Sequence, residues 1–549
     1  MKKLLYLGVA ILILSTSCKK YLDNAYKNPN LPTYASPELV LQSIIANTHR
    51  GTAFDTRTIG FYNQNFAQVP NGTTLNQNFV NAERHGYTAG SDINAEIWRT
   101  HYWNYGYNII DMIDSSRLVG KFDYVAAAYS MNAWSWVTTA DIYGELPVRQ
   151  AFEKGRLSFE YDNQDVAYAR ALSECDSALA NWDRAALMTT PTLAAGDLYF
   201  FKGDQSRWKK FVYGVKARIY QRFFKKSTYL SNQVDSVLKY TNLAMANTND
   251  DAMIEFNINF PDATAQNFYG PRRNNLGQFR VSQFTMNMLT GTTTTPGLVY
   301  GNTTNDPRVR YIFRPSVNGT YNGITSGRFL DNPTTPADTR VPSLWGRVGE
   351  FATPTLGTDS GARTFFRNDS KFPIMTYSEM QFLRAEAFFL KGDAANARVA
   401  YINGINGHFD MLNTHFFGYL NTLGTNSPAL MTKVTIPAAE RAAYLADPAF
   451  VPATLTLKHI MCQKYFALWG WGHVESWVDL RRYNYDEINI YPSFTRLDVI
   501  RLFFENGGKL AERIRPRYNS EYLWNIDALT AVGGFIPDYH TKKVWFTQP

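Results

Sequence analysis

The sequence predicts a mainly α-helical protein: a tetratricopeptide-like scaffold of helical pairs that carries a loop-rich irregular subdomain within one large domain. Three observations predict this. Apolar and aromatic residues recur at helical spacing over about 36–250 and 376–485, which would form the scaffold. A capped helical hairpin begins at Thr376. Between the two helical stretches, about 255–372 is dominated by proline, glycine, asparagine and threonine and shows no long amphipathic period.

Apolar stripes predict the helices of the first half of the scaffold. The first helix starts near Ser36. The next, from Asn94, has one stripe spaced 4, 3, 4, 3 and a second beside it, so we expect it to be covered on two sides. The stripes are Trp98, Tyr102, Tyr105, Ile109 and Met112, and Trp103, Tyr107 and Ile110. Further helices are predicted at about Tyr124–Thr139, Asp165–Trp182, Ser206–Phe224 and Val234–Met245.

The second half of the scaffold opens with a helix–turn–helix pattern. Thr376 followed by Glu379 is the pattern of a capping box. Gly392 can supply a left-handed stop, and Asp393 can cap the next helix. Helical pairs with small residues at their crossing are typical of tetratricopeptide-like hairpins. The units are scattered rather than tandem, which favours several helical pairs in one domain.

Two irregular stretches are expected to carry function. Residues 63–92 are rich in Asn, Gln, Gly and Thr, and 255–372 is too long to be a simple linker. Because a rigid scaffold can position loop side chains without packing them away, binding residues tend to lie on such loops.

The N-terminus has the pattern of a lipoprotein signal. Lys2 and Lys3 precede a short apolar run, and small residues lead directly to Cys18. Residues 1–17 are therefore predicted to be a signal peptide, with Cys18 acylated and 18–549 forming the mature domain. An ordinary secretory signal with an incidental cysteine is the alternative. Cys175 and Cys462 are expected to be buried thiols rather than a disulfide framework.

Composition and motifs argue against several classes of function. The 549 residues carry a formal charge of +8, spread along the chain, which gives little support to nucleic-acid binding. No nucleotide-binding, zinc-protease or serine-hydrolase motif is present, and no histidine pair has ligand spacing on a predicted helix. We therefore expect no cofactor and no metal. The aromatic content of 15% would serve either a core or a sugar-binding surface.

One stretch near the C-terminus gathers charge and aromatic rings. In Ile460–Tyr485, Glu475 and Asp479 lie one helical turn apart, with Trp477, Arg481 and Arg482 around them. Two carboxylates can serve glycoside hydrolysis. Alternatively, the arginines neutralise the carboxylates in a buried knot of ion pairs, with Arg481 stacked on Trp477.

This stretch also carries a family resemblance. Gln463-Lys464-Tyr465, Glu475-Ser476-Trp477 and Arg481-Arg482-Tyr483 resemble the C-terminal pattern of the SusD/RagB family, with Tyr483-Asn484 in place of the family's threonine-glycine. Similar patches are Asn28-Pro29-Asn30, Asp141–Pro147 and the segment around Glu386. Together they span essentially the whole mature chain.

The resemblance implies a nutrient-binding outer-membrane lipoprotein of Bacteroidetes that is not an enzyme. Such a protein would be anchored in outer-membrane lipid through acylated Cys18 and exposed on the cell surface. It would bind a glycan, most readily an oligosaccharide, or a peptide, and deliver it to a partner TonB-dependent SusC-like transporter. A secreted glycoside hydrolase using Glu475 and Asp479, and a helical-repeat adaptor that binds only proteins, are the alternatives.

The candidate ligand-binding residues come mainly from the irregular stretches. Aromatic rings offer flat apolar faces to a sugar, and a few polar groups fix its orientation. The candidate residues are Trp98, Asn76, Asn78, Arg84, Tyr269, Arg272 and Trp345.

Overall fold

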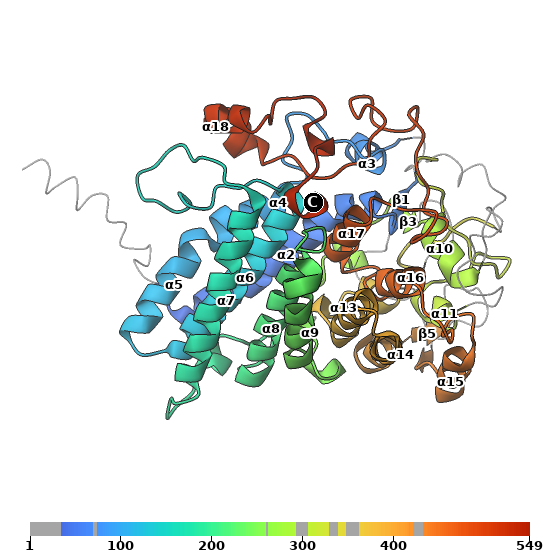
Figure 1. Cartoon of the computed structure of the whole chain (residues 1–549), viewed down its shortest axis with the longest axis horizontal. Coiled ribbons are helices and arrows are strands. Elements are labelled where there is room, and N and C mark those ends of the chain that lie inside the picture. Colours follow the sequence, from blue (N-terminus) through green and yellow to red (C-terminus); the bar gives the residue numbers. More distant parts are fainter. Residues whose placement is uncertain are drawn as a thin grey trace, which may run out of the picture.

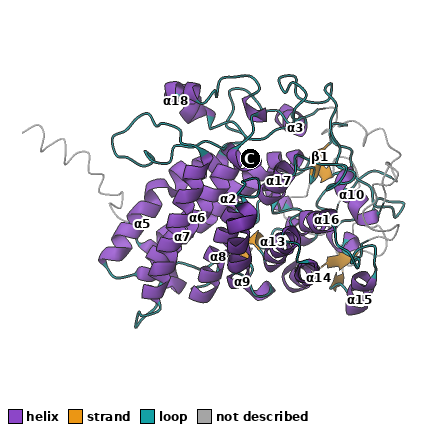
Figure 2. Ribbon diagram, in the orientation of Figure 1, coloured by secondary structure: helices purple, strands orange, loops and turns teal. Residues whose placement is uncertain are grey.

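The computed structural model describes residues 35–69, 74–257, 259, 262–291, 306–328, 339–346, 362–416, 418–420 and 432–549. Helices dominate these residues and strands are few and short (Figures 1 and 2). The predicted signal peptide and Cys18 lie outside the described residues. Cys175 and Cys462 are buried free thiols, as expected.

The first half of the scaffold is a row of helices in which chain neighbours pack together (Figure 1). α6 packs on α7, α7 on α8, and α8 on α9, while α2 runs behind them. All four helices predicted between 124 and 245 are present. The helices are α2 (Pro37–Tyr62), α5 (Gly106–Leu118), α6 (Phe122–Tyr143), α7 (Gln164–Ala185), α8 (Gln205–Gln221) and α9 (Val234–Leu243).

The second half begins with the predicted hairpin, in which α13 packs along α14. Gly392 has a left-handed φ of 79°, and the Asp393 side chain accepts from the amide of Asn396, as predicted. Thr376 accepts from the amide of Glu379, but the Glu379 carboxylate bonds Arg218 instead of returning to the cap, so only half of the capping box forms. The helices are α13 (Tyr377–Leu390), α14 (Ala394–Met411), α15 (Ala438–Ala446), α16 (Leu457–Ala467) and α17 (His473–Arg482).

The stretch predicted to be loop-rich is irregular where it is described. Within 255–372 its longest described helix is α10, with eight residues. The remaining short elements there are α11 (Val309–Ile312) and the 3₁₀ turns η5 (Ala263–Ala265), η6 (Pro271–Arg273) and η7 (Thr364–Phe366), with α10 spanning Gln283–Thr290.

The described residues contain three antiparallel strand pairs, two of which connect distant parts of the chain. β1 pairs with β3 in the register Phe66↔Val281, which joins the two irregular stretches. β2 pairs with β4 and has a bulge after Ala252. The strands are β1 (Phe66–Gln68), β2 (Ala252–Ile254), β3 (Phe279–Val281), β4 (Phe372–Met375), β5 (Gly418–Leu420) and β6 (Thr432–Val434), the last two forming the third pair.

The helix predicted from Asn94 is not continuous. It divides into α4 (Glu96–Arg99), the π-helix η1 (Thr100–Tyr105) and α5, which follows from Gly106. A π-turn contains an additional residue, so it rotates the side chains that follow it. The first stripe is largely buried, but the expected second cover is absent: Trp103 is 76% exposed and Tyr107 is 41% exposed. The prediction of a helix covered on two sides was therefore wrong.

The C-terminal segment returns over the scaffold (red in Figure 1). The amide of Ile514 donates to the carbonyl of Ile142, and the amide of Phe546 donates to Gln164. No helix among the described residues has both the length and the apolar character needed to cross a membrane. The remaining short elements are α3 (Gln77–Glu83), α18 (Ile526–Ala531), the π-helices η3 (Tyr229–Gln233), η8 (Leu412–Phe416) and η10 (Tyr518–Tyr522), and the 3₁₀ turns η2 (Leu193–Ala195), η4 (Thr248–Asp250), η11 (Tyr539–Thr541) and η12 (Trp545–Thr547).

Candidate ligand-binding site

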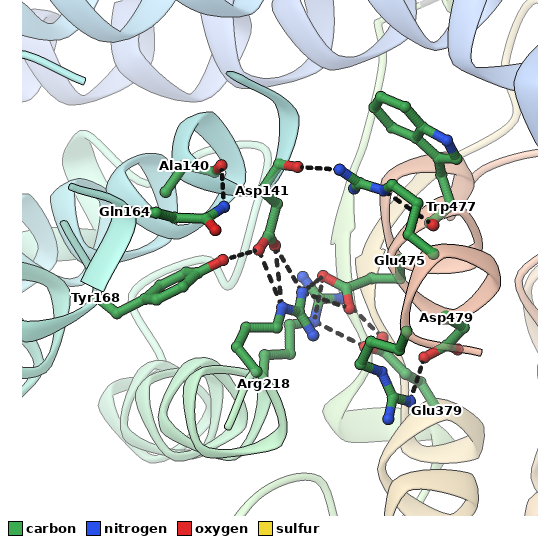
Figure 3. Close-up of polar contacts among 12 residues, drawn as sticks. Ala140, Asp141, Gln164, Tyr168, Arg218, Glu379, Glu475, Trp477 and Asp479 are labelled. Atoms are coloured by element: carbon green, nitrogen blue, oxygen red, sulfur yellow. Dashed lines mark hydrogen bonds and ion pairs between the residues drawn. The ribbon is translucent and has the colours of Figure 1, made fainter. Parts of the chain in front are cut away.

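The Glu475 carboxylate lies inside a buried ion-pair network (Figure 3). Both of its oxygens accept from Arg222 at 2.8 Å, and Arg218 lies at 3.4 Å. Burial alone would raise its pKa, but the charges of Arg218, Arg222 and Lys464 lower the pKa to about 2. An acid that is ionised near neutral pH cannot donate a proton to a leaving group. The adjoining cavity, of about 30 Å³, has room for water and not for a sugar ring.

Asp479 is equally enclosed. It pairs with Lys464 at 2.8 Å and with Arg482 at 2.6 Å, and Arg482 also pairs with Glu386 at 2.8 Å. The Arg481 guanidinium lies 3.7 Å from the centre of the Trp477 ring. The interpretation as a knot of ion pairs and cation–π contacts is thus confirmed. Because its partners come from α6, α8, α13 and α16, the network fixes α17 to the scaffold.

Two of the candidate aromatic residues pack in the core. Tyr269 is fully buried and Trp345 is 1% exposed. The Trp345 indole N–H donates to the carbonyl of Tyr269 at 2.7 Å, and the Tyr269 hydroxyl lies 2.5 Å from that of Thr56. Their rings thus join the loops to the scaffold and offer no exposed face to a sugar. The expectation that loop position would expose them was wrong, because both rings are buried and that of Tyr269 packs against Phe366 and Phe372.

Two of the polar candidates, Asn76 and Arg84, use their side chains in local structure. Asn76 caps α3 by accepting from the amide of Asn78 at 3.0 Å. The Arg84 guanidinium donates to the carbonyls of Arg501 and Leu502, each at 2.9 Å, and to Ile500. The amide of Arg272 donates to Asn368. The structure does not bring these side chains together with Trp98 in one cavity.

Trp98 lines an aromatic pocket of about 440 Å³ that sequence reasoning did not assemble. We call it the aromatic pocket. Its walls come from α4, from η1, from the loop that follows α6, and from η10. The C-terminal segment therefore completes a pocket whose other walls include residues near 98. The lining residues are Trp98, Arg99, Tyr102, Trp103, Tyr107, Pro147, Ala151, Phe152, Phe159, Arg517, Ser520 and Glu521.

Hydrogen bonds hold the loop against the helices in this pocket. The Tyr102 hydroxyl donates to the carbonyl of Pro147 at 2.8 Å, and the Tyr107 hydroxyl donates to that of Phe152 at 3.0 Å. Phe152 itself has a left-handed φ of 64°, a costly conformation for a residue with a side chain. Strained backbone and π-helical turns both cluster at functional sites. The ring positions are therefore set before any ligand arrives.

Polar groups stand at the edge of the aromatic surface. Glu521 is buried, and its Oε2 accepts from Tyr161 at 2.8 Å and from Asn525 at 2.9 Å. Arg517 pairs with Asp92 at 2.7 Å and keeps part of its side chain exposed. A carboxylate that its neighbours hold in place can accept from sugar hydroxyls, and arginine can donate to them. The pocket therefore combines flat apolar faces with a few fixed polar groups, as ligand pockets do.

Sequence reasoning missed most of this pocket. Trp103 and Tyr107 were assigned to a buried stripe, and Phe152 and Phe159 were not singled out. The π-turn at 100–105 leaves no mark in the apolar period. One usable signal was present: Trp103 and Tyr107 lie off the main stripe, where a polar residue is more typical of a helix.

Metal-ligating side chains are few among the described residues of this pocket. They contain no group of three or more His, Cys, Asp or Glu side chains that could hold a metal ion. The lining includes one carboxylate, that of Glu521, and no histidine or cysteine.

A family model described as "Starch-binding associating with outer membrane", SusD-like, matches residues 29–498. A SusD/RagB family protein from Bacteroides thetaiotaomicron superposes with a TM-score of 0.65 at 20% identity, covering 94% of this chain and 99% of that one. A chitin-binding protein gives 0.66 at 18% identity, covering 93% and 100%. A chitin-binding SusD homologue from Flavobacterium johnsoniae gives 0.62 at 18% identity, covering 92% and 98%.

At these identities the solved structures establish a shared fold, which is the helical fold predicted from the sequence. No curated protein matches the chain. The family model covers most of the sequence, including the stretch from Ile460 to Tyr485 on which the resemblance was first noted. The chain therefore belongs to the SusD-like family, whose members are described as starch-binding and as associating with the outer membrane.

Proposed function

We propose that this protein binds an oligosaccharide without transforming it, and that the aromatic pocket is where the sugar binds. The observation that carries the proposal is the exposed ring of Trp103, 76% accessible, beside the half-buried rings of Tyr102 and Phe152. An exposed tryptophan in a pocket wall is costly in water unless a ligand covers it. The family description and the chitin-binding relatives support a glycan as that ligand.

Each group would have a distinct part in binding. The rings of Trp103, Tyr102 and Phe152 would contact the C–H faces of sugar rings. Glu521 and Arg517 would accept from and donate to hydroxyl groups at the ring edges. The Trp98 ring lies 4.9 Å from that of Tyr102 between ring centres, and this packing would hold the stacking surface in place. A rigid surface loses little entropy when the ligand binds.

We propose further that the bound sugar is delivered to a SusC-like TonB-dependent transporter, and that acylated Cys18 tethers the protein to the outer membrane beside it. Support comes from exposed apolar side chains on the C-terminal segment, whose backbone runs along the upper edge of Figure 1. They are Ile500, Phe504, Trp524 and Ile536. Exposed apolar surface of this kind is typical of a protein interface.

The binding proposal is tested by calorimetry with maltohexaose and chitohexaose. Trp103→Ala should weaken binding of the recognised glycan by about tenfold, because burial of an aromatic ring is lost. Trp524→Ala is the matched control, since Trp524 is also 76% exposed but lies outside the pocket lining. Unchanged affinity in Trp103→Ala, or an equal loss in both variants, would contradict the proposal.

A further inference from the structure

A second cavity lies against α2, and nothing in the proposed function uses it. Its volume is about 560 Å³, within the range of small-molecule sites. One wall is the face of α2 that carries Gln42, Ala46 and His49, and the opposite wall comes from the segment after β2 and from η6. We call it the α2 cavity. It shares no lining residue with the aromatic pocket.

Arg273 is a charged group in the α2 cavity for which the described residues provide no ion pair. Its side chain is about half-buried, and burial followed by the nearby charge of Arg50 lowers its pKa. Its Nη1 donates to the carbonyl of Ala263 at a long 3.3 Å, and it lies 5.5 Å from the centre of the Phe268 ring. Asp262 is near, but among the described residues no carboxylate forms an ion pair with Arg273. A partly desolvated guanidinium without a counter-ion favours an incoming anion.

The other charges around this cavity leave it positive. Glu255 is already shared between Lys202 and Lys371, at 2.8 Å each. Arg50 pairs with Glu96 at 3.3 Å. The one lining carboxylate is thus covered by two lysines, so it does not offset the charge of Arg273.

His49 lies in the same wall of the cavity, with its ring buried. Its Nε2 lies 3.0 Å from the amide of Phe268, and because that amide can only donate, Nε2 accepts and the ring proton is on Nδ1. Burial and the charge of Arg273 lower the pKa of His49 to about 3, so the ring is neutral. The buried Nδ1–H group has no hydrogen-bond partner among the described residues. An unpaired buried donor is unfavourable unless an acceptor is supplied.

Aromatic rings give the cavity apolar faces as well. Tyr199, Phe256 and Phe268 line it, and Phe256 packs edge-on against His49 at 4.6 Å between ring centres. Ala46 is exposed on the facing turn of α2, and its small side chain leaves the cavity open there.

We propose that the α2 cavity is a second ligand site, and that it takes a small molecule bearing a carboxylate, which Arg273 binds while the rings of Tyr199 and Phe256 contact its apolar faces. Planar guanidinium and carboxylate groups match in a two-bond geometry. A sugar acid and the C-terminus of a short peptide share this chemistry.

The experiment measures binding of four probes to the full mature chain by calorimetry. Glucuronate and acetyl-glycyl-glycine carry the carboxylate, while glucose and acetyl-glycyl-glycinamide are their neutral counterparts. We expect at least one acid to bind and its neutral counterpart not to bind. Which acid binds identifies the source of the carboxylate. Binding of neither acid, or equal binding of an acid and its neutral counterpart, would overturn the proposal.

Two variants locate the site. Arg273→Gln should weaken acid binding about tenfold or more, as expected for loss of a charge-assisted hydrogen bond, and Arg273→Lys should restore it in part. Ala46→Leu should block the cavity with a larger side chain while Arg273 stays unchanged. It therefore tests the site even if Arg273→Gln folds poorly. Arg117→Gln, an exposed arginine on α5, is the control. Acid binding unaffected by both Arg273→Gln and Ala46→Leu would overturn the assignment. Glycan binding at Trp103 should be unchanged in these variants, which separates this site from the proposed function.

Discussion

At the scale of single residues, burial separates tryptophans that look alike in the sequence. Trp345 comes from a loop-rich stretch and is 1% exposed, whereas Trp103 comes from a predicted helix and is 76% exposed. The difference arises from tertiary packing: the Trp345 indole N–H donates to the carbonyl of Tyr269 in the core, whereas Trp103 lies in η1, off the buried stripe. Trp345 therefore contributes to stability, and Trp103 is available for a ligand.

Trp345→Ala should lower the free energy of unfolding by about 3–5 kcal/mol, because it leaves a cavity and an unpaired carbonyl at Tyr269. Urea denaturation followed by circular dichroism measures this. Glycan affinity of the folded fraction should stay the same. If the variant were as stable as the parent protein but unable to bind glycan, Trp345 would be a ligand-binding residue and this prediction would be wrong.

At the scale of elements, α17 is held by charge rather than by apolar packing alone. Its Glu475 and Asp479 carboxylates pair with Arg222 of the region ending α8, with Lys464 of α16 and with Arg482 of α17 itself. Removing one partner of such a network leaves an uncompensated buried charge. The network is therefore expected to make stability depend on pH.

The pH dependence follows from Glu475. Its pKa falls from an ordinary 4.5 to about 2 in the folded protein, so its ionised form stabilises the fold above pH 4.5. This contribution is lost as the pH falls from 4.5 toward 2. The free energy of unfolding should decrease over this range, and Glu475→Gln, already less stable, should show a shallower decrease. Denaturant titrations at several pH values test this, and parallel curves for the two proteins would contradict it.

The turn of the α13–α14 hairpin allows backbone strain to be tested without a change in side-chain packing. Gly392 has a φ of 79°, and a Cβ placed there would meet nothing within 4 Å, so Gly392→Ala changes only backbone strain. We expect a loss of about 1–2 kcal/mol in the free energy of unfolding. Gly277→Ala is the control, because Gly277 has no positive φ and its Cβ would make ordinary contacts. Equal effects of the two substitutions would contradict a left-handed turn at Gly392.

At the scale of the whole molecule, local patterns were enough to predict the scaffold but not the pocket. The helices of 124–245 and the hairpin at Thr376 follow from periodicity and caps, which are properties of neighbouring residues. The aromatic pocket brings Trp98 and Phe152 together with Glu521 from the far end of the chain. The spacing of residues along the sequence cannot predict that residues so far apart line one pocket. Even in the charge network, the sequence indicated α17 but not Asp141 or Arg222, which lie 81 residues apart.

The central claim, that the aromatic pocket holds the glycan, is tested most directly by a crystal structure of the protein with the hexasaccharide that it binds in calorimetry. We predict a sugar ring against the face of Trp103, with a hydroxyl group hydrogen-bonded to Glu521 or Arg517. A glycan bound at another surface, with the aromatic pocket occupied by water alone, would contradict the claim.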